Sequence, residues 1–190
     1  MRRVWMKSLV LLAVVGASGL ALHAQQIVHA VSGVVTAVDP ASTTITIKTN
    51  DDSLGIFRYE EKLKADILFD KDVRSGTTEP EGFNKVGDHI VAYYFDGNLG
   101  RTIVAIKDFG PTGLNSVSGT VIKNKHHVIT IRTDAGATMT FDIAKDASAE
   151  TPQGVVSGFK FDADQGTRVS VRYTESGGTK TAQFIRNAFG

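Results

Sequence analysis

Three short stretches carry residue types whose spacing could support chemistry. The pair His126-His127 offers metal ligands, residues 162–167 place acidic oxygens at alternate positions before a glycine, and residues 176–181 combine two glycines with Lys and Thr. Adjacent side chains on a strand point to opposite faces, so the two imidazoles are poorly placed to share one ion. The acidic stretch lacks the bidentate Glu that completes a calcium loop, and no helix follows the glycines as a phosphate-binding loop requires. The histidine pair and the glycine stretch are therefore predicted to be turns, and the acidic stretch is not expected to bind calcium.

No other part of the chain offers a catalytic constellation. Cysteine is absent, which removes thiol chemistry, disulfides and thiolate metal sites. The sequence contains neither Gly-x-Ser-x-Gly nor His-Glu-x-x-His, and its paired carboxylates lie in turn-like segments among Lys and Arg. We expect a protein that is not an enzyme and holds no cofactor.

Residues 1–24 have the features of a secretory signal peptide. A basic start precedes an apolar run over residues 9–15, and small residues then lead to a predicted cut after Ala24, with Ala21 as the alternative. The apolar run is shorter than the roughly 20 residues that cross a bilayer, so no stable membrane span is expected after cleavage. The predicted location is periplasmic or secreted.

The net charge of the chain bears on which classes of partner are expected. The chain has 21 Lys and Arg against 20 Asp and Glu, a net charge of +1, and loss of Arg2, Arg3 and Lys7 with the signal takes this to −2. Nucleic-acid binding normally needs a basic face, so nucleic acid is not expected. The expected partner is an envelope protein or a small ligand.

One motif is written twice along the chain. Residues 31–35 read Val-Ser-Gly-Val-Val and residues 117–121 read Val-Ser-Gly-Thr-Val, and an alternating Ile-Thr-Ile strand follows each copy. A Gly-Pro-rich linker at 110–114 separates them. The predicted domains are one repeat at 27–109 and a second at 115–190.

Both repeats indicate an all-β fold: two tandem small β-barrels of five to six strands, similar to the OB fold. In the first repeat, Gly33 lies inside the first strand, where a tightly coiled barrel strand must bend, and Gly119 is its counterpart. A flat sandwich with ordinary bulges is the alternative. Strands are expected at 31–38, 44–49, 54–59, 66–69, 89–95 and 101–107 of the first repeat.

The Val-x-Gly-x-Val motif, Asp39-Pro40, the Ile-Thr-Ile-Lys strand and residues 85–88 (Lys-Val-Gly-Asp) resemble a family of exported bacterial domains of unknown function. More distantly, they resemble the periplasmic copper-chaperone barrels of metal-efflux systems. The resemblance implies a small OB-like barrel. It also implies that copper binding would need a His, two Met and a Trp around the second and third strands. Only Met139 stands there, and Trp5 leaves with the signal, which is too few soft ligands for Cu(I).

Comparison of the repeats singles out one surface. In the second repeat, the outward face of residues 168–174 is polar, whereas the first repeat carries Val91, Tyr93 and Phe95 there, with Val104 beside them. Apolar groups of this size are unfavourable in water. Either the second repeat or the segment 62–85 covers this surface, or it is a site for a partner or ligand.

The sequence therefore favours an exported, non-enzymatic tandem-barrel protein of the cell envelope with a binding or structural role. A periplasmic metal-binding or metal-homeostasis protein is the first alternative. An oligosaccharide-binding module is the second, by analogy with other OB folds.

Overall fold

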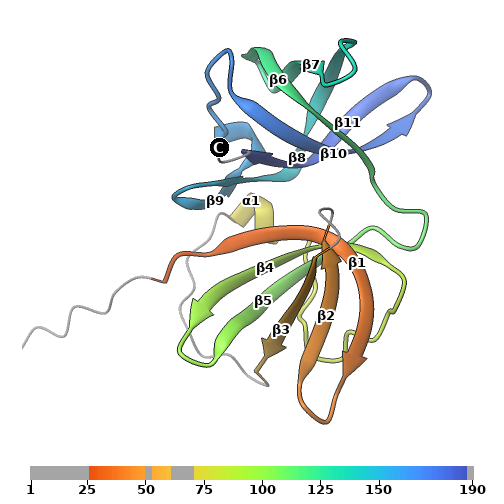
Figure 1. Ribbon diagram of the computed structural model, residues 1–190, viewed down its shortest axis with the longest axis vertical. Coiled ribbons are helices and arrows are strands. Elements are labelled where there is room, and N and C mark those ends of the chain that lie inside the picture. Colours follow the sequence, from red (N-terminus) through yellow and green to blue (C-terminus); the bar gives the residue numbers. More distant parts are fainter. Residues whose placement is uncertain (1–25, 50–52, 61–70, 188–190) are drawn as a thin grey trace, which may run out of the picture.

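The computed structural model describes residues 26–49, 53–60 and 71–187, which form two β-barrels in tandem (Figure 1). The first contains β1 (His29–Asp39), β2 (Thr44–Thr49), β3 (Leu54–Tyr59), α1 (Lys71–Arg74), β4 (His89–Gly97) and β5 (Gly100–Asp108). The second contains β6 (Asn115–Lys125), β7 (Val128–Thr133), β8 (Thr138–Thr151), β9 (Gly154–Ser157), η1 (Gly158–Lys160), β10 (Arg168–Ser176) and β11 (Thr179–Asn187).

The two barrels share one topology. The first closes in the order β1-β2-β3-β5-β4, with β4 antiparallel to β1 and β3 parallel to β5. In the second, β6, β7 and β8 take the places of the first three strands, and β11 pairs in parallel with β8 to close the circle. The parallel closure between the third and last strands is the OB arrangement, so the predicted tandem of small OB-like barrels is confirmed.

Alternating sequence produces this fold. In β2, Ile45 and Ile47 are fully buried while their neighbours face outward, and β3 alternates strictly between exposed and buried residues. The same period in β7 buries Ile129 and Ile131. Each barrel therefore has its own apolar interior.

A glycine lets the first strand of each barrel approach the second. A Cβ on Gly33 would overlap the carbonyl of Lys48, and a Cβ on Gly119 would overlap that of Arg132. Both first strands also carry a β-bulge two residues later, at Val35/Ala37 and Val121/Lys123. The sequence prediction that glycine permits this bend is correct, and close backbone approach is the reason.

The Val-Gly-Asp motif at residues 86–88, just before β4, forms backbone hydrogen bonds with the bulge of β1. Gly87 has φ +94°, a conformation that favours glycine, and donates its N–H to the carbonyl of Val35 at 2.8 Å. Val35 in turn donates to the carbonyl of Asp88 at 3.0 Å. Gly166 and Val121 repeat the first of these bonds in the second barrel at 2.9 Å. The glycine and its bond to the bulge are therefore a structural feature of both repeats, although the second repeat has Gln165 and Thr167 on either side of that glycine.

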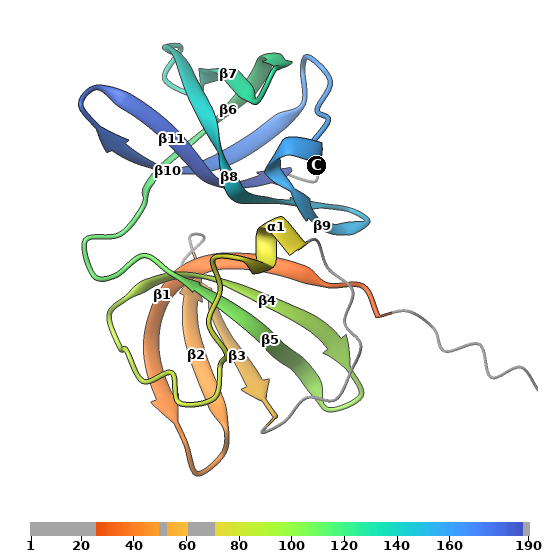
Figure 2. The same cartoon turned by 180° about the vertical axis from the view of Figure 1, so that it is seen from behind.

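The second barrel has one addition that approaches the first. Its third strand, β8, continues past the barrel and pairs with β9, and α1 of the first barrel packs against both (Figures 1 and 2). The irregular segment of the first repeat thus contains α1, which the sequence did not predict, and an isolated bridge between Thr78 and Ile106. The predicted signal peptide and the predicted strand at 66–69 lie outside the described residues.

Within residues 26–49, 53–60 and 71–187, no helix has both the length and the apolar character needed to cross a bilayer.

Candidate functional site

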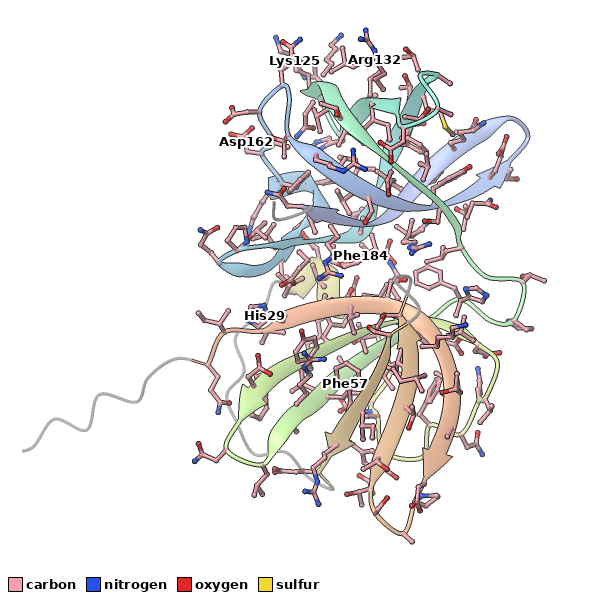
Figure 3. The ribbon with its side chains drawn as sticks, in the orientation of Figure 1. His29, Phe57, Lys125, Arg132, Asp162 and Phe184 are labelled. Atoms are coloured by element: carbon pink, nitrogen blue, oxygen red, sulfur yellow. The ribbon has the colours of Figure 1, made fainter. Side chains whose placement is uncertain are left out.

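The surface singled out by the repeat comparison lies between the barrels. Val91 and Tyr93 on β4 have no exposed surface, and they belong to an apolar cluster with Ala30 of β1 and Phe184 of β11. Figure 3 labels Phe184 between the two barrels. Val104 packs against this cluster with part of its surface exposed. We call this set the inter-barrel cluster; its buried members are Val28, Ala30, Val73, Val91, Tyr93, Ala105 and Phe184.

Phe95 is the one member of the predicted surface that lies outside this cluster. The β4–β5 pairing shifts by one residue between Tyr93 and Tyr94, and Phe95 comes after this bulge, opposite Thr102. It is 7% exposed but belongs to none of the three apolar clusters of the described chain. The structure therefore brings together Val91, Tyr93 and Val104 and leaves Phe95 apart.

Tyr93 links the barrels by a hydrogen bond as well as by packing. Its hydroxyl lies 2.9 Å from the hydroxyl of Ser148 on β8, and both side chains are fully buried. Burial raises the pKa of Tyr93, so the phenol stays protonated at neutral pH. An aromatic ring with a satisfied polar tip is well suited to such a contact.

Two polar contacts between the barrels flank the inter-barrel cluster. Lys107 of β5 reaches across to Asp146 of β8, with its Nζ 2.7 Å from the carboxylate and 2.9 Å from the backbone carbonyl. Burial lowers the pKa of Lys107, and the hydrogen bond to Asp146 opposes that shift. Removing one partner would leave the other charge with poor compensation.

The second contact that flanks the inter-barrel cluster joins Glu150 of β8 to the start of β1. Its two carboxylate oxygens each lie 2.7 Å from a nitrogen, one from Nδ1 of His29 and one from the backbone N–H of Ala30. Burial raises the pKa of Glu150, while the bonds from His29 and Ala30 oppose that shift. A backbone bond from Val155 of β9 to Val28, at 2.7 Å, completes the contact.

The histidine pair and the glycine stretch form turns, as predicted. His126 and His127 occupy the β6–β7 turn with φ +54° and +62°, and His127 stacks on Phe159 with ring centroids 3.8 Å apart. Gly177 and Gly178 form the β10–β11 turn with positive φ. Residues 162–167 lead into β10. Among the described residues, no three His, Cys, Asp or Glu side chains converge as a metal site would need.

The first barrel also carries an exposed apolar pair that was not predicted from the sequence. Leu54 and Ile56 project outward from β3 and are 66% and 67% exposed. In the second barrel the matching positions on β8 are Thr138 and Thr140. Comparing the repeats along this strand, as was done for β4, would have found the pair.

Within the described part of the chain, β3 is paired over only a short part of the edge that faces β5. β3 pairs with β5 only at Arg58 and Tyr59. Among the described residues, the outer edge from Leu54 to Ile56 has no neighbouring strand. The strands 2–3 face of an OB barrel is also the face that such folds generally use for ligands.

The protein is therefore an all-β protein of two OB-like barrels that share a buried contact, with two exposed aliphatic side chains on β3 of the first barrel.

Comparisons with known proteins add similarity in fold only. No family model matches the chain, and no curated protein matches it. Two similar solved structures are the crystal structure of Ag(I)CusF and a structure of apo-CusF residues 6–88 from Escherichia coli. They show 20% and 19% sequence identity, cover 40% of this chain and 97% and 88% of their own chains, and each has a TM-score of 0.31.

Proposed function

We propose that this chain is an exported, non-enzymatic binding protein whose first barrel takes an extended segment of a partner protein along β3. The observation that carries the proposal is the exposed pair Leu54 and Ile56, each about two-thirds exposed, at positions where the second barrel has threonine. The shared fold does not need apolar residues at these positions, because the second barrel forms without them.

The geometry of β3 favours a polypeptide over other ligands. An open strand edge offers unpaired backbone groups to an added strand, and alternate side chains of β3 supply the specificity. Leu54 and Ile56 are two such alternate side chains, and both are aliphatic. Single-stranded nucleic acid is bound chiefly by stacking on aromatic rings. The outward residues of β2 and β3 include no aromatic ring.

The inter-barrel contact supports the same proposal because it buries the other candidate partner surface of the first barrel. The apolar groups of β4 that the sequence offered as a partner surface are buried against the second barrel. The β2–β3 face of the first barrel is therefore left as the exposed apolar strand face of this repeat. Among the described residues, Leu54, Ile56 and Leu99 are the three most exposed large hydrophobic side chains.

The test is capture of a partner by the immobilised mature chain from an envelope extract of the source cells. The double variant Leu54→Thr/Ile56→Thr gives the first barrel the residues of the second. We expect the wild type to retain a discrete protein and the double variant to retain about tenfold less or lower, since central apolar contacts carry most of the energy of an interface. Both residues are exposed, so the melting temperature should change little.

Leu99→Thr is the matched control. Leu99 is 76% exposed and lies in the β4–β5 turn and not on β3, so its replacement removes a similar apolar area from a different element. Capture by this variant should equal that of the wild type. Equal capture by all three proteins, or no discrete protein captured by the wild type, would contradict the proposal.

A further inference from the structure

Arg172 of β10 is a buried guanidinium on the outward face of the second barrel. The residue is 8% exposed, although its strand neighbours Arg168 and Ser170 on the same face keep more contact with solvent. Its cross-strand partner on β11 is Phe184, a member of the inter-barrel cluster. Cross-strand partners lie on the same face about 5 Å apart, so Arg172 borders the contact between the barrels.

None of the described residues pairs with the charge of Arg172. Its Nε is buried without a hydrogen-bond acceptor, and no ion pair of the described chain involves the residue. By contrast, Arg168 on the same strand makes a bidentate pair with Asp134, at 2.9 and 2.8 Å. Burial alone lowers the pKa of Arg172 to about 10, with no opposing contribution from a nearby acid. A buried guanidinium N–H without an acceptor is rare in folded proteins and calls for an explanation such as a bound anion.

The equivalent position in the first barrel shows that the fold can satisfy a polar group here. Tyr93 pairs with Ala30 and Ala105, and Arg172 pairs with the corresponding residues Ser116 and Phe184. The hydroxyl of Tyr93 has its acceptor or donor in Ser148. The guanidinium at the same place in the second barrel has none. The second repeat therefore differs from the first by a charge that the protein itself does not neutralise.

We propose that Arg172 binds a small molecule through a carboxylate or phosphate group, at the border of the inter-barrel cluster. A guanidinium presents its N–H groups in a planar fork that matches two oxygens of either group, and Nε–H is one donor of that fork. Arg172 is 8% exposed, so an anion can approach it from solvent. This site is separate from the β3 face of the first barrel and does not depend on it.

The test is a thermal-melting titration of the full mature chain with sodium phosphate and with sodium acetate, against sodium chloride at matched ionic strength. For the wild type we expect a saturable rise in melting temperature with phosphate, acetate or both, of about 3 to 6 °C at ten times Kd. Arg172→Met should abolish the rise. Arg168→Met, which removes an exposed arginine of the same face, should retain it.

Arg172→Met should also melt at or above the temperature of the wild type without added anion, because it removes an unpaired buried charge. Arg172→Gln provides a second neutral variant, and calorimetric titration of phosphate provides a second measurement. The proposal is overturned if neither anion raises the melting temperature of the wild type above the chloride control. It is equally overturned if Arg172→Met or Arg172→Gln responds as the wild type does.

Discussion

Replacing Tyr93 by arginine is expected to lower the free energy of unfolding by about 3 to 5 kcal/mol. The substitution places a charge in a fully buried position between the barrels and removes the bond to Ser148. For a chain of this size, the melting temperature should fall by about 6 to 20 °C. Denaturant unfolding, followed by circular dichroism, measures the change in free energy directly.

Two variants separate burial from other effects of the substitution. Tyr93→Phe keeps the ring and removes only the hydroxyl, so it should cost about 1 kcal/mol. Leu99→Arg introduces the same charge at a residue that is 76% exposed, and it should have little effect. A change below 1 kcal/mol for Tyr93→Arg would mean that the barrels do not cover this side chain in solution.

Gly119→Ala is expected to destabilise the second barrel by about 2 to 4 kcal/mol. The added methyl would overlap the Arg132 carbonyl and would lie 2.9 Å from the Cα of Thr133, so the β6–β7 backbones must separate. Gly33→Ala should act in the same way on β1 and β2, because the same approach occurs in the first barrel. Urea unfolding of each variant gives the free energy.

Gly97→Ala is the matched control for these two glycines. Gly97 also lies in a strand, but a Cβ there would first meet a ring carbon of Phe95 at 3.3 Å and the Gly100 carbonyl at 3.5 Å. Its replacement should change stability by less than about 1 kcal/mol. Similar losses at Gly97 and Gly119 would show that strand propensity, not backbone approach, governs these positions.

The repeat made the fold predictable from the sequence. Ile45 and Ile47 alternate with polar residues in one copy and Ile129 and Ile131 do so in the other, so both the strands and their buried faces could be assigned. Gly33 and Gly119 marked the bend of the first strand. These are local patterns, and a pattern repeated twice is hard to attribute to chance.

The departures from the repeat were harder to predict. One departure is the continuation of β8, which pairs with β9 in the second barrel. The other is α1, which lies in the irregular segment of the first barrel. Their role is to join the barrels, through pairs such as Tyr93 with Ser148 and Lys107 with Asp146. Such pairs connect residues far apart in the sequence, and no local period indicates them.

The candidate sites were predictable only in part. The repeat comparison identified Val91, Tyr93 and Val104 as residues with a special role, and left open whether a domain or a partner covers them. The exposed pair Leu54 and Ile56 was also predictable, because an alignment of β3 with β8 places apolar residues in the first repeat opposite threonines in the second. Arg172 was placed on the outward face, but its burial depends on how the two barrels pack together and has no signature in the sequence.

The central claim is that the two barrels unfold as one unit because the inter-barrel cluster and the polar contacts that flank it join them. Differential scanning calorimetry of the wild-type mature chain tests this most directly. We predict one transition whose calorimetric and van't Hoff enthalpies agree, as expected for a single cooperative unit. Two resolved transitions, each with the enthalpy of one barrel, would contradict the claim.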